Sequence, residues 1–175
     1  MHAAIHADLK TYLVEEHSQD AFDNILRSAG FSNEYFESAE YFQDTELEVL
    51  LNAAANELNM TRDEILLANG IKAAPGLMEA FKSFMQEDWN TLDLVEAVEL
   101  NMHKYAREEM AAFPPVLKTE RVSDTELIVN VRSHRKMWAL AQGFITGFAK
   151  SYGDKVDLKT TIDGTNCRFE IKVTS

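Results

Sequence analysis

Residues 125–133 read TELIVNVRS and residues 135–152 read RKMWALAQGFITGFAKSY, and the change of period between them decides the fold. In the first stretch Leu127, Val129 and Val131 alternate with other residues, which is the two-residue period of a half-buried strand. In the second stretch the aromatic and aliphatic residues recur at helical spacing. The chain is therefore predicted to pass here from a strand into a helix.

Two more strands are predicted downstream of that helix. Residues 155–162 (KVDLKTTI) and 167–173 (CRFEIKV) alternate in the same way, and Asp163-Gly164 lies between them. An Asp-Gly pair between two alternating stretches is a strong hairpin signal, because both turn positions need a positive φ. The C-terminal half is thus predicted to be rich in antiparallel strands, with one helix between them.

The N-terminal half shows helical periodicity instead. Apolar residues recur there at spacings of three and four, and the resulting helices are predicted at residues 1–17, 20–29, 45–58, 61–68, 75–86 and 90–112. Helices that precede strands along a chain usually pack on one side of the sheet. The fold class is therefore predicted to be α+β, with a helical N-terminal half packed against an antiparallel sheet.

Capping residues set the expected helix ends. Thr45 with Glu48 and Thr61 with Glu64 have the spacing of capping boxes. Asn69-Gly70 predicts a break in the chain. The remaining boundary signals are Asp20 as an N-cap, Gly30 as a helix stop, Pro75 as a first-turn residue and Pro114-Pro115 as the end of the helix 90–112.

Composition limits the class of protein. The 175 residues are expected to form a single domain, 1–175, and 46% are hydrophobic, which excludes a disordered chain. A net charge of −12 argues against nucleic acid and anionic membranes as partners. The first residues lack the basic and apolar regions of a secretory signal, and no apolar run approaches a membrane span, so we expect a cytoplasmic protein. The one cysteine, Cys167, cannot form an internal disulfide.

His103 is the most informative single residue. It lies inside the predicted helix 90–112, on a stripe shared with Leu92, Val95, Ala106 and Met110. A neutral imidazole on an apolar stripe is what a five-coordinate haem iron requires. A core histidine that bonds a backbone carbonyl has the same pattern, so periodicity alone leaves both readings open.

Ser133 and Arg135 form a second candidate site, directly after the alternating strand. A hydroxyl and a guanidinium two residues apart can bind one carboxylate together, with the guanidinium giving a bidentate pair. Haem propionates are carboxylates of this kind. The alternative is an ordinary solvated strand end.

Other chemistries find little support. His2 and His6 are four residues apart on the first helix, which permits a two-ligand metal site, although the pattern favours incidental surface histidines. The chain contains no GxSxG, Walker or GxGxxG motif and no nucleophile with an evident base, so we do not expect an enzyme.

Together these segments resemble the H-NOX (haem–nitric oxide/oxygen binding) family, which is related to the sensor domain of soluble guanylate cyclase. The resemblance extends over essentially the whole chain, including DTELEVLLNAAANELNMTRDEILLANG, the helix with His103, Pro114-Pro115 and the passage VRSHRKMWALAQGFITGFAKSYGDKV. The family signature Tyr-x-Ser-x-Arg corresponds to residues 131–135, where Val131 replaces the tyrosine. Gly143 and Gly147 also fit the family pattern.

The resemblance implies a haem b site. It makes His103 the proximal iron ligand, gives Ser133 and Arg135 two of the three propionate-binding positions, and identifies Pro115 as the proline that presses on the haem plane. Residues implied to line the distal side are Ile5, Leu9, Met78, Leu140 and Phe144. Because Val131 lacks a hydroxyl, one hydrogen bond to the propionates is lost, which is worth about 1 kcal/mol.

The resemblance also implies a function. Leu140 matches the position of the tyrosine that donates to bound O₂ in oxygen-binding members, so selectivity for NO and CO over O₂ is expected. In the family NO weakens the bond between the iron and its histidine, and the change passes to a partner such as a histidine kinase or a cyclic-di-GMP enzyme. The alternative, favoured by Val131, is a haem-free ligand- or protein-interaction module of the same fold.

Overall fold

The sheet occupies the C-terminal half of the molecule. The computed structural model describes residues 3–33, 43–110 and 112–174. Its four strands pair antiparallel in the order β1-β2-β4-β3, and their bounds are β1 Val116–Ser123, β2 Glu126–Arg132, β3 Lys155–Asp163 and β4 Asn166–Thr174. The hairpin predicted around Asp163-Gly164 is confirmed.

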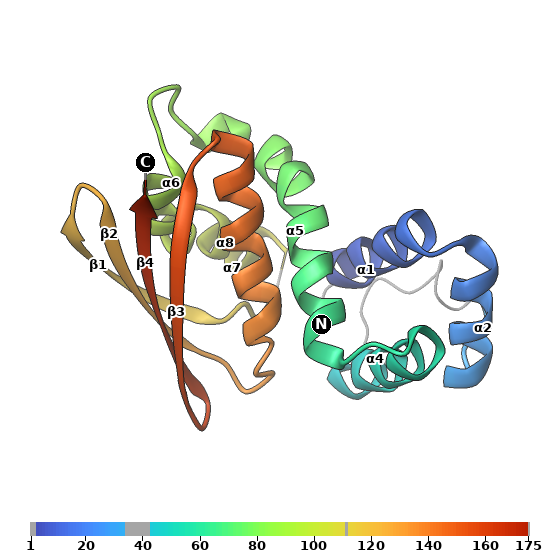
Figure 1. Ribbon diagram of the computed structural model, residues 1–175. Coiled ribbons are helices and arrows are strands. Elements are labelled where there is room, and N and C mark those ends of the chain that lie inside the picture. Colours follow the sequence, from blue (N-terminus) through green and yellow to red (C-terminus); the bar gives the residue numbers. More distant parts are fainter. Residues whose placement is uncertain (1–2, 34–42, 111, 175) are drawn as a thin grey trace.

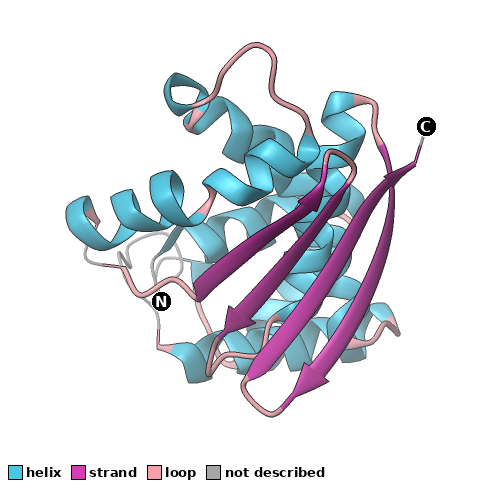
Figure 2. Cartoon of the chain, turned by 90° about the vertical axis from the view of Figure 1, so that its left-hand side faces the viewer, coloured by secondary structure: helices cyan, strands magenta, loops and turns pink. Residues whose placement is uncertain are grey.

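Helices cover one face of this sheet and leave the other open (Figure 2). The alternating residues of β2 and β4 are buried on the covered face, where Val129 pairs with Phe169 and Leu127 with Ile171. They pack with apolar residues of α8 (Trp138–Tyr152) and α6 (Thr91–Ala97) in one cluster, which we call the sheet cluster. The predicted α+β class, with helices on one side of an antiparallel sheet, is confirmed.

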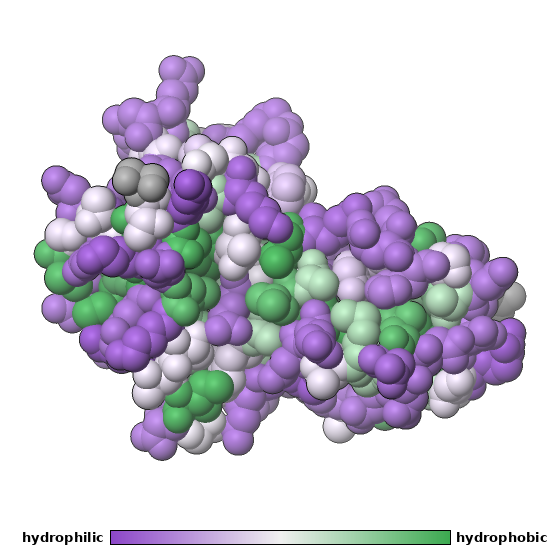
Figure 3. Space-filling model, in the orientation of Figure 1, coloured by the Kyte–Doolittle hydropathy of each residue, from purple (hydrophilic) through white to green (hydrophobic). Residues whose placement is uncertain are grey.

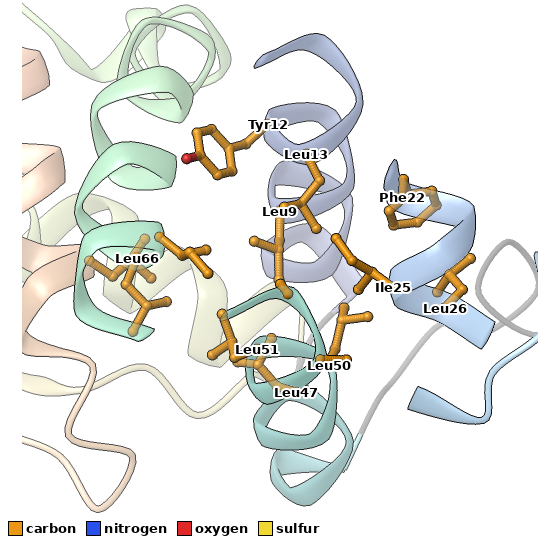
Figure 4. Close-up of a cluster of buried hydrophobic side chains, with 14 of the residues drawn as sticks. Leu9, Tyr12, Leu13, Phe22, Ile25, Leu26, Leu47, Leu50, Leu51 and Leu66 are labelled. Carbon is orange, nitrogen blue, oxygen red and sulfur yellow. The ribbon is translucent and has the colours of Figure 1, made fainter. Parts of the chain in front are cut away.

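A separate helical lobe lies beside the sheet (Figure 1). It consists of α1 (Ala3–Glu16), α2 (Gln19–Ala29), α4 (Asp44–Leu58) and the first turns of α5 (Arg62–Ala80). Their side chains meet in a second cluster, the helical cluster, in which Leu9, Ile25, Leu50 and Leu51 point toward one another (Figure 4). Each of these four side chains is almost completely buried.

The long helix α5 joins the two lobes. Ile65 and Leu66 near its start belong to the helical cluster, whereas Ala74 belongs to the sheet cluster. The predicted break at Asn69-Gly70 and the new helix at Pro75 are therefore wrong, because α5 runs without interruption through both. In the space-filling view, apolar side chains reach the surface along the junction where α5 and α8 lie (Figure 3).

Glycines let α5 and α8 approach at backbone distance. A Cβ atom on Gly70 would lie 2.5 Å from the carbonyl oxygen of Leu140, and one on Gly143 would lie 2.3 Å from the carbonyl oxygen of Leu67. Real Cβ atoms do not tolerate such contacts. Gly70 thus serves close helix packing rather than helix termination, which is the physical reason the predicted break does not occur.

The observed helix caps agree only in part with those predicted from the sequence. Thr61 and Glu64 form the predicted capping box of α5, and Gly30 ends α2 with a φ of 77°. The box of α4 is wrong in its register, because Gln43 and Glu46 form it instead of Thr45 and Glu48. The N-cap of α2 is Ser18 rather than Asp20.

Thr61→Ala is expected to lower the free energy of unfolding by about 1 kcal/mol, because the hydroxyl accepts a hydrogen bond from the Glu64 amide. Chemical denaturation of both proteins measures the change. Thr45→Ala is the matched control, since Thr45 lies inside the first turn of α4 and does not cap it. An equal loss in both variants would contradict the observed caps.

The predicted helix 90–112 is divided into shorter elements. A π-helical turn η2 (Glu99–His103) separates α6 from α7 (Lys104–Glu109). The predicted helix 75–86 is wrong as well, since α5 ends at Ala80 and a 3₁₀ turn η1 (Lys82–Phe84) follows. α8 begins at Trp138, three residues later than predicted. Among the described residues no helix is long and apolar enough to span a bilayer.

Candidate functional site

His103 ends the π-helical turn. Its backbone amide donates to the carbonyl oxygen of Val98, five residues earlier, over 2.9 Å. This wider turn inserts about one residue into the helical period, and such turns are frequent at functional sites. The His103 side chain is only 18% exposed, beside the buried side chain of Met102.

The imidazole of His103 is held by two polar groups. Its Nδ1 lies 3.1 Å from Oε2 of Glu99, and the backbone carbonyl of Pro115 lies close enough to the ring to favour its protonated form slightly. Burial lowers the pKa of His103 below its usual value, although Glu99 partly opposes that shift. The ring is therefore neutral at pH 7, which is the form that a metal ion requires.

Three of the predicted site residues line one pocket. Its volume is about 530 Å³, and its lining residues are Phe113, Pro114, Pro115, Val116, Arg132, Ser133, His134, Arg135 and Thr165. The strand β2 ends at Arg132, so Ser133 and Arg135 lie in the loop between β2 and α8, directly after the strand. His103 is not a lining residue, but it contacts the wall of the pocket through Pro115.

Arg135 already binds a carboxylate in this structure. Its Nε donates to Oδ1 of Asp44 over 2.9 Å, and its Nη1 donates to the carbonyl oxygen of Phe113 over 2.6 Å. The neighbouring His134 reaches the other oxygen of Asp44, with Nε2 and Oδ2 2.8 Å apart. The loop therefore links to α4 of the helical lobe, and its geometry suits a carboxylate ligand.

Asp44→Asn is expected to destabilise the fold by about 1 kcal/mol at pH 7. Burial disfavours the Asp44 carboxylate, but hydrogen bonds from Arg135 and His134 outweigh it and lower its pKa. The stabilisation is therefore present above the unfolded pKa of about 3.9 and is lost as the pH falls through the lower folded pKa.

Unfolding measured from pH 7 to pH 3 tests this expectation. The gap between wild type and Asp44→Asn should be widest at neutral pH and should close in acid. Asp63→Asn is the matched control, because Asp63 is also a first-turn aspartate but lies in α5. A gap that does not change with pH would contradict the assigned role of the Asp44 carboxylate.

The five predicted distal residues do not all lie in one cluster. Leu9 and Leu140 are buried in the helical cluster, with Ile5 packed against it, whereas Met78 packs against the sheet cluster. Phe144 contacts both clusters and stacks on Phe148 at a ring distance of 6.0 Å. These residues thus line both sides of the junction between the lobes.

The alternative metal site finds no support among the described residues. His6 is buried in the helical lobe rather than exposed, and burial lowers its pKa to about 4. His2 lies outside the described residues. Within the described ranges no three His, Cys, Asp or Glu residues group as metal ligands.

Sequence reasoning missed two acidic residues of the site. Glu99 lies four residues before His103, and that helical spacing was the only available signal. Asp44 is 91 residues from Arg135, and no local pattern reveals such a contact.

The fold is that of H-NOX proteins. Solved structures with this fold include the Fe(II) unliganded H-NOX protein from K. algicida, at 14% identity and a TM-score of 0.87, with 100% of this chain and 97% of that chain covered. The S. oneidensis H-NOX protein in the Fe(II)NO state has 17% identity and a TM-score of 0.86, with both chains covered completely. A mutant of T. tengcongensis H-NOX has 19% identity and a TM-score of 0.87, with 100% of this chain and 98% of that chain covered.

A sequence model of the family described as Haem-NO-binding matches residues 2–160. The chain therefore belongs to the haem-NO-binding family. No curated protein sequence matches it.

The donor groups of this chain fit a haem. A neutral, partly buried imidazole could supply one nitrogen ligand, and a guanidinium that binds a carboxylate lies across the Pro115 segment from it.

Proposed function

We propose that the chain binds haem b with His103 as the proximal iron ligand and senses NO. The observation that carries this proposal is the neutral, partly buried imidazole of His103, which lies beside Pro115 in the wall of the pocket that contains Ser133 and Arg135. Bound haem would supply an iron atom that coordinates diatomic gases. The residues of the chain would hold the porphyrin, exclude water and select the gas.

Arg135 and Ser133 would bind the propionates. The guanidinium already pairs with the Asp44 carboxylate, so a propionate would share it or take the place of Asp44. The Ser133 hydroxyl, which now accepts from the Arg135 amide over 3.2 Å, would donate to the same carboxylate. Val131 would make no contact with the propionates, because its side chain is buried in the sheet cluster.

The apolar side of the site would select the gas. Leu140 and Phe144 have no hydrogen-bond donor to offer bound O₂, which needs one to stay on ferrous iron, whereas NO and CO do not. This is the support for selectivity toward NO and CO. Pro115 would press against the porphyrin from the side of His103, since its carbonyl lies close to that ring.

The signal would leave through the helix of His103 and strand β1. Arg121 of β1 binds Asp93 and Glu96 of α6, at 2.6 and 2.9 Å, so a shift of this helix would move the edge of the sheet. The chain is proposed to act on a separate partner, a histidine kinase or a cyclic-di-GMP enzyme, and to have no catalytic activity of its own.

Absorption spectra of the reduced, haem-loaded protein test the proposal. We expect a Soret band that shifts when NO or CO is added and no oxygenated spectrum in air. An oxygenated complex in air would contradict the assigned selectivity. A protein that stays colourless after haem is added would support the alternative, a haem-free interaction module of the same fold, which the buried Val131 favours.

A further inference from the structure

We propose that Glu99 is a positioning residue that fixes the ring orientation of His103 and sets its strength as an iron ligand. This inference rests on the proposed function of His103 as the haem ligand. It assigns a role to a carboxylate that the sequence did not single out.

Glu99 is itself held in place by several donors. Besides Nδ1 of His103 at 3.1 Å, its Oε2 accepts from the Leu117 backbone amide over 3.0 Å. Its other oxygen accepts from the guanidinium of Arg107. The side chain is only 21% exposed. Three donors from three segments therefore hold one partly buried carboxylate, so its position relative to the imidazole is defined.

The hydrogen bond has a chemical consequence for the ring. A neutral imidazole has one proton to donate, and a carboxylate is a stronger acceptor than the neutral carbonyl of Pro115, so Nδ1 keeps the proton and Nε2 the lone pair. A carboxylate acceptor also makes Nε2 more basic and restricts the rotation of the ring. Glu99 thus favours the tautomer that could ligate iron, and it would strengthen the bond from Nε2 to that iron.

Glu99 also links its helix to β1 through Leu117, so a purely structural role must be separated from this one. Glu96 provides the comparison. It lies one turn earlier and also links the helix to β1, because it accepts from Nε of Arg121 over 3.1 Å. Its carboxylate bonds Arg121 and not His103, so Glu96 shares the structural role alone.

Resonance Raman spectra and haem-loss rates of the full chain test the inference. We compare wild type, Glu99→Gln and Glu96→Gln, all loaded with ferrous haem for the spectra and with ferric haem for transfer to excess apomyoglobin. Glutamine keeps the shape of the side chain and an oxygen for the Leu117 amide. Glu99→Gln should lower the iron–histidine stretching frequency and speed haem loss by about 10-fold, whereas Glu96→Gln should match wild type.

Two outcomes would overturn the inference. In one, Glu99→Gln leaves the stretching frequency and the loss rate unchanged. In the other, Glu96→Gln changes both as much as Glu99→Gln does. In either case the proposed function stands as long as the haem of the wild-type protein is bound by a histidine. If the wild-type protein takes up no haem, both the inference about Glu99 and the proposed function are overturned. That result is obtained before any variant is compared.

The haem-free protein supplies an independent readout. ¹⁵N chemical shifts should report the Nδ1-protonated tautomer of His103 in wild type and in Glu96→Gln, and a mixture of tautomers in Glu99→Gln. A single unchanged tautomer in all three proteins would count against the positioning role of Glu99.

Discussion

His103→Gly is expected to abolish stable haem binding at micromolar protein, and free imidazole is expected to restore it. The substitution removes the only nitrogen ligand that we assign to the iron, while it leaves room for an imidazole molecule in the same place. Loss of one ligand and of its hydrogen bond to Glu99 should weaken haem affinity by at least roughly 100-fold. Haem titration followed at the Soret band, with and without imidazole, measures this change.

The variant needs a control for stability. Glycine inside a helix destabilises it by about 1 kcal/mol, which could lower haem uptake without any role in ligation. Recovery with imidazole separates the two effects, because imidazole does not repair a helix. His17→Ala serves as the second control, since His17 bonds Tyr12 in the helical lobe. If His103→Gly binds haem like wild type without imidazole, the ligand assignment is wrong.

Gly143→Ala should lower the free energy of unfolding by about 3 kcal/mol. The new methyl group would lie 2.3 Å from the Leu67 carbonyl oxygen and 2.9 Å from Cα of Gly70. Backbone atoms cannot rotate away as a side chain can, so α5 and α8 would have to separate along their contact. Denaturation curves of the two proteins give the difference directly.

Gly76→Ala is the matched control for that substitution. Gly76 also lies in a helix of the same pair, α5, but a Cβ atom there would meet nothing within 4 Å. Alanine should stabilise this position by about 0.5–1 kcal/mol, because it has less backbone entropy to lose. A similar effect of both variants would mean that the α5–α8 contact is not as close as described.

The sequence predicted those parts of the fold whose signal is local. The strands β2 and β4 alternate cleanly because one face packs on helices and the other meets water. The strand β1 was not predicted, since in VLKTERVS the partly buried positions carry Leu117, Thr119 and Arg121 rather than an apolar series. The tertiary contact of Gly70 likewise overrode its local preference for a break.

The residues of the candidate site likewise differ in how far the sequence could predict them. His103, Ser133 and Arg135 could be predicted as a set only through the family resemblance, because spacing alone left each of them ambiguous. Asp44 could not, since a hydrogen bond between distant segments leaves no trace in one sequence, and Glu99 was missed although its spacing of four from His103 is that of a helical contact. The π-helical turn was missed because apolar periodicity tolerates one extra residue.

The helix α5 carries the described backbone from the helical lobe to the elements that surround the sheet. Most pairs of lobes are joined by an exposed linker that a protease can cut. Here the passage is a helix interior in which Asn69, Gly70 and Ala74 are buried. Limited digestion of the native protein should therefore trim other segments without releasing either lobe, and the two lobes should melt in a single transition.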